Sequence, residues 1–157
     1  MPDTTPFRPA TPEDLSIIAH NLREECRDEC LAINGFDPLA SFTADRDKIF
    51  VFDGKGRLPC AFVAVEAVGR DCVVQIAVTN SIKANTYDFV RAMAKFFTDL
   101  HRQYDKIHSL VDARNVPTAV LLRECAFEFV QRFDKFGSEQ RAFNLYTSRS
   151  RAEGKAN

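Results

Sequence analysis

The sequence predicts a single α/β (α+β) domain with a mixed central sheet of about six to seven strands flanked by helices. Three observations support this fold class. The chain has 157 residues, a length typical of one domain that buries its own core. Apolar residues make up 45% of it and charged residues 27%, the balance of a globular protein. Segments with strand-like and helix-like spacing of apolar residues alternate throughout, so we expect the domain at 1–148 and a polar tail at 149–157.

The first predicted elements are a short strand at 6–10 and a long helix after it. Thr11 is suited to cap this helix, Pro12 to its first position, and Asp14 to the reciprocal bond of a capping box. An apolar stripe at helical spacing predicts that the helix continues to about residue 32. The stripe is formed by Leu15, Ile18, Ala19, Leu22 and Cys26.

The rest of the chain continues the alternation of strands and helices. Three apolar stretches separated by glycine-containing turns are typical of an antiparallel meander, and a helix with a clean apolar stripe follows them. The predicted ranges are a short helix or turn at 38–42, strands at 48–52, 58–68 and 72–78, a helix at 85–104, a strand at 107–111, a helix at 116–125, and strands at 127–136 and 141–147. The order is therefore β-α-(α)-β-β-β-α-β-α-β-β.

Charge and hydropathy exclude several classes of protein. The net charge of -1 and the pI of about 6.3 argue against a nucleic-acid partner held by bulk charge. No apolar run reaches the roughly 18–20 residues that span a bilayer, and the N-terminus lacks the basic start and apolar stretch of a signal peptide. We therefore expect a cytoplasmic protein that binds neither nucleic acid nor membrane.

The cysteines are five in number, which favours free thiols over a disulfide framework. Cys26 and Cys30 lie four residues apart on the predicted helix and so could face one ligand. No second pair at zinc spacing follows them, and their neighbours are acidic. No metal site is predicted.

The element order, with a long helix after the fourth strand and a shorter one after the fifth, resembles the GNAT (GCN5-related N-acetyltransferase) fold. The stretch from Asn115 to Phe127 is similar to the late signature of that family, although Ala126 stands where the family has glycine. The resemblance implies transfer of an acetyl group from acetyl-CoA to an amine, with a small amine or a protein as the acceptor. It also implies a homodimer as one arrangement of the chain.

A narrower resemblance involves three segments, 8–14, 21–29 and 104–115. They look like the internal virion protein A family of short-tailed phages, whose members are GNAT-like in fold. This resemblance implies a partner in the phage virion or the host cell, and a location in the host cytoplasm or the virion.

The loop after the predicted strand at 72–78 would hold the pyrophosphate of acetyl-CoA in a GNAT enzyme, through the pattern Gln/Arg-x-x-Gly-x-Gly/Ala. Lys83 keeps the positive charge, but Thr86 and Asp88 replace the two glycines. Glycine lets backbone N–H groups approach phosphates, and a carboxylate about 4–5 Å from a phosphate costs roughly 3–4 kcal/mol before screening. The resemblance thus implies a weakened cofactor site formed by Ala77, Val78, Thr79, Lys83 and Asn115.

The catalytic residues are not evident in the sequence. Leu122 stands where many GNAT enzymes carry a tyrosine that protonates the departing CoA thiolate, which leucine cannot do. Glu66 and His108 interrupt apolar strands and are the weak candidates for a general base, although a side chain that points to solvent is the simpler interpretation of each. Asn115 is either a helix N-cap or a ligand contact, and one role does not exclude the other.

Two functions follow from these features. The first is a phage-type GNAT-fold protein whose acyl-CoA site is degenerate, a pseudoenzyme that acts on a virion or host protein through its surface. The alternative is an acyl-CoA-dependent N-acetyltransferase with a variant phosphate loop, for which acetyl-CoA is the cofactor.

Overall fold

The central sheet is described by a computed structural model that covers residues 6–35 and 48–150, so the helix or turn predicted at 38–42 lies outside the described residues. Within them, one seven-stranded sheet has the order β1-β2-β3-β4-β5-β7-β6. Neighbouring strands are antiparallel except β4 and β5, which are parallel. The strands are β1 (Phe7–Pro9), β2 (Ile49–Asp53), β3 (Pro59–Val68), β4 (Asp71–Val78), β5 (Lys106–Asp112), β6 (Glu128–Phe136) and β7 (Arg141–Arg149). The predicted fold class is confirmed.

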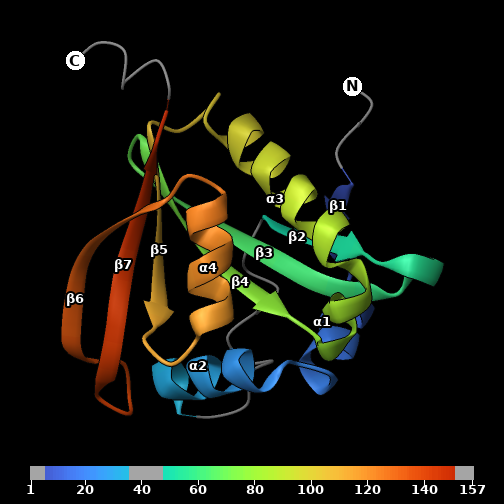
Figure 1. Cartoon of the computed structure of the whole chain (residues 1–157), viewed down its shortest axis with the longest axis horizontal. Helices are drawn as coiled ribbons and strands as arrows, with labels where there is room; N and C mark the ends of the chain where they lie inside the picture. The colour runs from blue at the N-terminus through green and yellow to red at the C-terminus, as the bar shows by residue number, and fades with distance from the viewer. Residues whose placement is uncertain (1–5, 36–47, 151–157) are drawn as a thin grey trace.

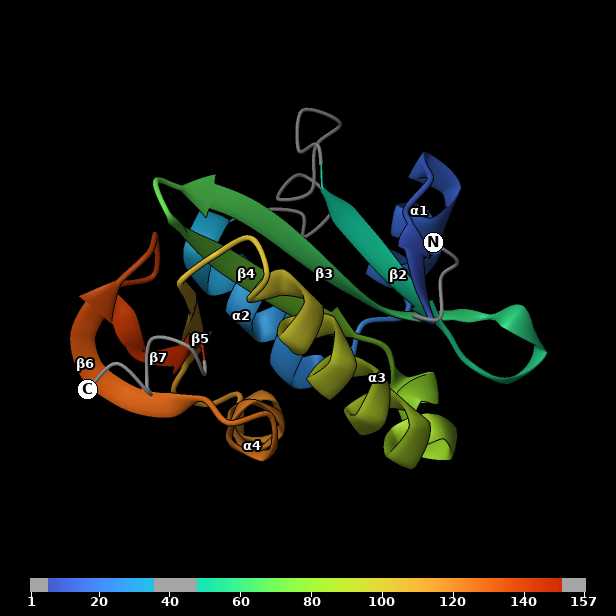
Figure 2. The same cartoon turned by 90° about the horizontal axis from the view of Figure 1, so that it is seen from above.

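The described α-helices are α1 (Pro12–His20), α2 (Glu24–Asn34), α3 (Thr86–Leu100) and α4 (Val116–Glu124). Figure 1 and Figure 2 show α3 and α4 over one face of the sheet and α1 on the opposite face. In Figure 1, α2 crosses the end of the sheet at which β4 and β5 finish. None of the helices in the described part of the chain is both long and apolar enough to cross a membrane.

The helix predicted from residue 12 to about residue 32 is in fact two helices, α1 and α2. Its start is as predicted, because Thr11 and Asp14 form both bonds of the capping box. The break comes at Leu22, which forms a β-bridge with Thr79 at the end of β4. The tertiary pairing thus overrides the helical stripe, since Leu22 stays buried in the core while its backbone leaves the helix.

The other boundaries also differ from the predictions. A 3₁₀ helix, η3 (Asn80–Asn85), precedes α3, and α3 ends at Leu100 rather than near Tyr104. Tyr104 is still buried, although it lies in the turn after the helix. β7 reaches Arg149, which pairs with Lys106, so the last strand enters the segment predicted as a tail.

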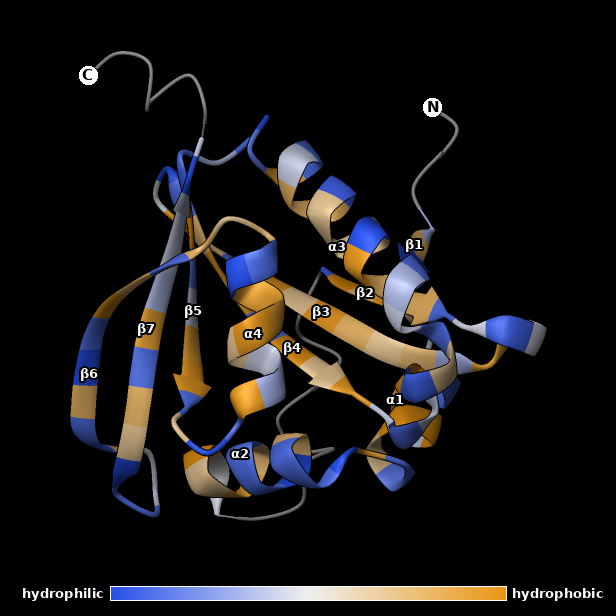
Figure 3. Ribbon diagram, viewed as in Figure 1, coloured by the Kyte–Doolittle hydropathy of each residue, from blue (hydrophilic) through white to orange (hydrophobic). Residues whose placement is uncertain are grey.

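The core lies between the sheet and the helices on both of its faces. Figure 3 shows apolar residues concentrated along the central strands. β3 is buried at every position from Pro59 to Val65, as expected for a strand covered on both faces. On α3, the Phe96 and Phe97 rings lie 4.8 Å from those of Phe7 and Phe127, respectively. These contacts fix α3 on the sheet.

The parallel strands β4 and β5 pair at only two positions, Cys72 with Ile107 and Val73 with His108. Beyond these positions the strands separate (Figure 1), and we call the opening between them the fork. A fork of this kind exposes strand backbone inside the protein, which other groups must satisfy.

Helix α2 closes the open end of the fork. At its start, the Arg23 N–H donates to the Val78 carbonyl at the end of β4, over 2.8 Å. Near its middle, the Glu29 carboxylate accepts from the Asp112 N–H at the end of β5, over 2.9 Å. α2 is therefore bonded to both strands of the fork.

Candidate functional site

A groove of about 770 Å³ lies between α3 and α4 and reaches the junction of α1 and α2. Its volume is within the range of small-molecule sites, about 300–1,000 Å³. Most of its walls are apolar, formed by Ile82, Phe89, Val90, Pro117, Val120 and Leu121. The polar lining residues are Arg23, Thr86, Tyr87 and Glu124. The groove can therefore hold a long apolar ligand with a few polar groups.

Arg23 is the basic residue among those that line the groove. Its side chain is only 18% exposed. Nη2 lies 3.5 Å from Thr118 Oγ1 and 4.0 Å from Cys26 Sγ, both long contacts. Nε is buried without a hydrogen-bond partner among the described residues, since Glu25 Oε1 is 3.6 Å away. A guanidinium has five N–H donors, so Arg23 makes little use of its capacity for hydrogen bonds.

Glu29 is a carboxylate buried at the fork, with 3% of the residue exposed. Its Oε1 accepts hydrogen bonds from Asp112 N at 2.9 Å and from Asn115 Nδ2 at 3.1 Å. Burial raises the pKa of Glu29 to about 7, because the two hydrogen bonds only partly offset the loss of water around the charge. A carboxyl group that titrates near neutral pH can accept a proton from an amine.

Asn115 is fully buried between α2 and α4. Its Oδ1 accepts from the Thr118 N–H at 3.3 Å, which confirms the predicted N-cap of α4. Its Nδ2 donates to Glu29 and lies 3.9 Å from Cys26 Sγ. The amide thus connects the start of α4 to the buried carboxylate on α2.

The backbone at the end of β4 is largely used within the protein. The Val78 carbonyl accepts from the Arg23 N–H, and the Val78 backbone also hydrogen-bonds the Cys26 thiol. The Thr79 N–H donates to Cys60 of β3, and Ala77 lies in the β3–β4 ladder. Because backbone groups alternate between the two edges of a strand, the next residue of β4 that faces the fork is Ile76.

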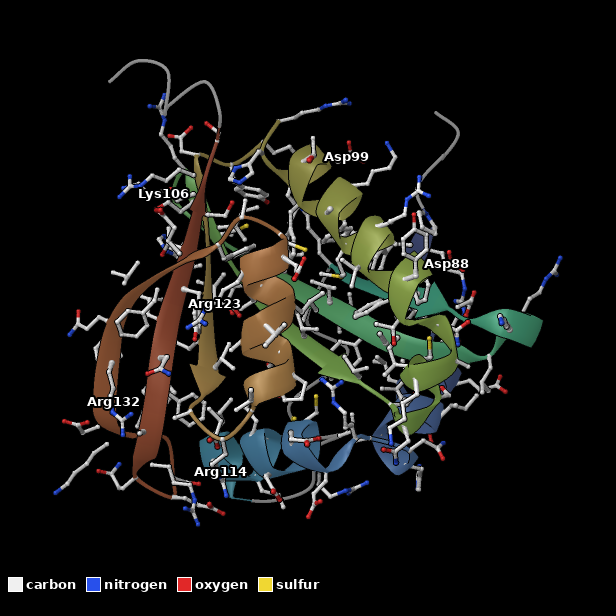
Figure 4. All side chains as sticks on the ribbon, in the orientation of Figure 1. Asp88, Asp99, Lys106, Arg114, Arg123 and Arg132 are labelled. Atoms are coloured by element: carbon white, nitrogen blue, oxygen red, sulfur yellow. The ribbon has the colours of Figure 1, made fainter. Side chains whose placement is uncertain are left out.

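The phosphate-loop residues lie in three different places. Lys83 is exposed and lines a separate hollow of about 280 Å³ with Lys55, on the other side of η3 from the groove. Thr86 lines the groove, and its Oγ1 donates to the Ile82 carbonyl at 3.2 Å. Asp88 lies on the flank of α3 that faces away from α4 (Figure 4), in a hollow of about 590 Å³ that also contains Arg91.

The position of Asp88 corrects the expectation that its carboxylate occupies the phosphate position. Asp88 is two residues after Thr86, so its side chain lies about 200° further around the helix axis. Thr86 lines the groove and Asp88 does not. A phosphate in the groove would therefore be separated from the Asp88 carboxylate by the backbone of α3.

Glu66 and His108 lie at the closed end of the fork. Both pair with Val73, Glu66 from β3 and His108 from β5. Glu66 is exposed, whereas His108 has both ring nitrogens engaged, Nδ1 with Thr147 Oγ1 at 2.8 Å and Nε2 with Asp71 Oδ2 at 3.1 Å. The structure does not bring either candidate base to the groove.

Leu122 and the five cysteines belong to the interior of the protein. Leu122 is fully buried and contributes to the core. All five cysteines are buried free thiols, and burial raises the pKa of Cys60, Cys72 and Cys125 to about 11. In residues 6–35 and 48–150, no group of three or more His, Cys, Asp or Glu side chains is arranged to hold a metal ion.

Arg23 and Glu29 are two charged residues at the fork that the sequence analysis did not assign to a site. One signal for Glu29 was present, because Cys26, Glu29 and Cys30 lie three and four residues apart on the side of α2 that is buried. A carboxylate on such a face is unusual. Arg23 carried no such signal, since only the break between α1 and α2 turns it towards the groove.

Comparison with known proteins gives a likeness in structure only. No protein-family model matches the chain, and no curated protein sequence matches it. A ribosomal-protein-alanine N-acetyltransferase from Brucella melitensis has a TM-score of 0.69 and 12% identity, over 91% of this chain and 98% of that one. AAC(6')-Ib in complex with paromomycin and acetyl-CoA has a TM-score of 0.68 and 13% identity, over 99% and 98%. A GNAT-family acetyltransferase from Bacillus anthracis has a TM-score of 0.64 and 14% identity, over 91% and 93%.

These structures are acetyltransferases, and nothing found supports the narrower resemblance to the internal virion proteins of phages. The likeness spans nearly the whole of each chain, so it includes the fork and the helices that flank the groove. At identities below 20% it concerns the backbone arrangement alone. The chain has the GNAT fold.

Proposed function

We propose that this protein is an acyl-CoA-dependent N-acyltransferase that transfers an acetyl group to the amine of a small molecule or a protein. The observation that carries the proposal is the groove between α3 and α4, which is lined by the first turn of α3 and by Arg23, whose backbone is bonded to the end of β4. Its apolar walls suit the pantetheine arm of the cofactor, and Arg23 suits an oxygen of the cofactor. The likeness to solved acetyltransferases, one of them in complex with acetyl-CoA, supports this assignment.

The residues that would hold the cofactor differ from the set that the sequence implied. Thr86 and Tyr87 line the groove at the first turn of α3, and the Asn85 side chain makes no capping bond there. The N-terminus of a helix favours an anionic group, and this turn faces the groove. Because Val78 is already bonded to α2, Ile76 is the β4 residue whose backbone would meet the acyl end.

Acetyl-CoA, when bound, supplies an acyl group activated as a thioester. In the transfer, the acceptor amine forms a C–N bond to the acetyl carbon, and the C–S bond breaks to release CoA as a thiolate that takes a proton from water. The amine nitrogen loses a proton. Glu29 is the group that we assign to accept this proton, because its carboxyl, which is not part of the groove wall, lies at the open end of the fork with a pKa of about 7. Asn115 and Asp112 N–H hold Oε1 of Glu29 in place, and closure by α2 limits the access of water.

The experiment that tests this function is calorimetric titration of the protein with acetyl-CoA and CoA, followed by an assay of acetyl transfer to small amines and to peptides. Binding near micromolar, followed by turnover, is the expected result. No heat of binding up to about a millimolar would exclude the function.

A second candidate function is that of a GNAT-fold protein that acts without catalysis, through a virion or host protein. Two observations favour it. Leu122 leaves no proton donor at its position, and the Val78 backbone is occupied by α2. This candidate predicts that acetyl-CoA either does not bind or binds without transfer to any amine.

A further inference from the structure

The floor of the groove contains an arginine whose hydrogen-bonding groups are mostly unused. The Arg23 side chain lies 18% exposed beside the fork, and its backbone is fixed by the bond to Val78. Its side-chain contacts in the described residues are all long, 3.5 Å to Thr118 Oγ1, 3.6 Å to Glu25 Oε1 and 4.0 Å to Cys26 Sγ, and its Nε has no hydrogen-bond partner there. Burial of an N–H donor without a partner destabilises a protein by about 1–3 kcal/mol.

A stabilising role in the fold does not account for this arrangement. An arginine that serves the fold usually makes a close, often bidentate, bond to a carboxylate. Arg114 is an example in this protein, since its Nη2 and Nε lie 2.7 and 3.0 Å from the carboxylate of Asp112. Arg23 has no bond of this kind, and its closest carboxylate contact is Glu25 at 3.6 Å.

The other cations of this region do not reach the groove. Lys83 and Lys55 line the hollow beside η3, and Arg91 and Lys95 line the hollow behind α3. Arg23 is therefore the positive charge that a ligand in the groove would meet among the described residues.

We propose that Arg23 binds an anionic oxygen group of a ligand whose apolar part fills the groove between α3 and α4. The inference deepens the proposed function and rests on it for the identity of the ligand. Two parts of an acyl-CoA have this chemistry, namely the diphosphate of CoA and the terminal carboxylate of a dicarboxylic acyl chain such as succinyl. In either case Arg23 supplies the charge that the glycine-free loop and Lys83 do not bring to the groove.

The test compares four forms of the full chain by calorimetry, namely the wild type, Arg23→Met, Arg23→Lys and Arg123→Met. Methionine keeps most of the length of the side chain and removes the donors. Arg123→Met is the matched control, because Arg123 is exposed on α4 and points away from α3 (Figure 4). The probes are CoA, pantetheine, succinyl-CoA, acetyl-CoA and decanoate.

The two sources of the anionic group give different results. If the diphosphate contacts Arg23, Arg23→Met weakens the binding of CoA by at least about tenfold and leaves that of pantetheine unchanged. If a carboxylate contacts Arg23, Arg23→Met weakens the binding of succinyl-CoA by the same factor. The binding of CoA and of acetyl-CoA is then unchanged. The affinity of Arg23→Lys is expected to lie between those of the wild type and Arg23→Met. The affinity of Arg123→Met is expected to be within about twofold of that of the wild type.

Further outcomes separate this inference from the proposed function. Equal binding of CoA, succinyl-CoA and decanoate by the wild type and Arg23→Met would overturn the role of Arg23 and leave the function intact. Binding of decanoate that depends on Arg23, without any binding of CoA, would support the site and overturn the function. The absence of binding for every probe would overturn both.

The stability of the free protein provides an independent readout. Without ligand, Arg23→Met is expected to unfold at the same temperature as the wild type or higher, because it removes the buried Nε donor, which lacks a partner. A lower unfolding temperature of both Arg23→Met and Arg23→Lys would indicate a structural role instead.

Discussion

Asn115 Nδ2 lies 3.1 Å from Glu29 Oε1, so the N-cap of α4 is bonded to a buried carboxylate 86 residues earlier in the chain. The contact joins α2, α4 and the end of β5, because the same Oε1 accepts from the Asp112 N–H. A single oxygen thus connects the three elements that surround the open end of the fork. Four predictions follow from this cluster and from the way α2 is held.

Glu29→Gln is expected to lower the rate of acetyl transfer by about 10²–10⁴-fold, the usual contribution of a general base. Glutamine still accepts the bonds from Asp112 and Asn115 through its amide oxygen, so the binding of acetyl-CoA is expected to be unchanged. The measurement is kcat and the Kd of acetyl-CoA for both proteins. Glu66→Gln, at the closed end of the fork, is the matched control and is expected to retain full activity. Equal rates for Glu29→Gln and the wild type would exclude Glu29 as the base.

The stability of the wild type is expected to fall as pH rises from about 4.5 to about 7, relative to Glu29→Gln. The folded-state pKa of Glu29 is raised from 4.5 to about 7 by burial, so in this range the folded protein holds a proton that the unfolded chain has lost. By linkage, this difference contributes roughly 3 kcal/mol that is present below pH 4.5 and lost above pH 7. Urea denaturation at pH 5 and pH 8 measures it, and Glu29→Gln corrects for the other titrating groups. Parallel pH profiles of the two proteins would contradict the prediction.

Asn115→Ala is expected to reduce the free energy of unfolding by about 2–3 kcal/mol. It removes the N-cap of α4 and one of the two hydrogen bonds to the buried Glu29. The control is Asn80→Ala, because Asn80 is exposed and donates its backbone N–H, not its side chain, to the Asn21 carbonyl. Urea denaturation of both variants measures the difference. A decrease of less than about 0.5 kcal/mol in the free energy of unfolding of Asn115→Ala would contradict the loss of both the cap and the hydrogen bond to Glu29.

Gly137→Ala is expected to destabilise the protein more than Gly56→Ala. Both glycines have positive φ, 74° and 72°, so the conformational cost of alanine is similar, about 1–2 kcal/mol. A Cβ at Gly56 would have no heavy atom within 4 Å, whereas a Cβ at Gly137 would clash with the Ala32 carbonyl oxygen on α2. The difference between the two unfolding temperatures therefore measures the contact between α2 and the β6–β7 turn. Equal losses would mean that α2 moves away from this turn without cost.

Local patterns predicted much of the architecture. The capping box at Thr11, the strand pattern of β3 and β4, and the apolar stripe of α3 each depend on residues close in sequence. The N-cap at Asn115 is local for the same reason, because its partner is Thr118. These features could be predicted because backbone and side-chain spacing alone decide them.

The functional site could be predicted only in part. The position of Asn115 beside the fork followed from the resemblance to GNAT proteins, and the groove residue Thr86 from the loop pattern. Thr86 and Asp88 were expected to face the same phosphate group, but the turn of α3 places Asp88 in a different hollow from Thr86. The bases suggested by polar interruptions, Glu66 and His108, lie at the wrong end of β4 and β5 for the groove.

The sequence by itself determined the fold class, the alternation of strands and helices and the caps of α1 and α4, because these depend on spacing within one segment. Only the tertiary structure decided that the chain leaves the helix at Leu22, and with it the positions of Arg23 and Glu29. The physical reason is that the backbone at the end of β4 needs partners where β5 separates from it, and the α1–α2 junction supplies them. That requirement arises between residues far apart in the chain, so no local pattern expresses it.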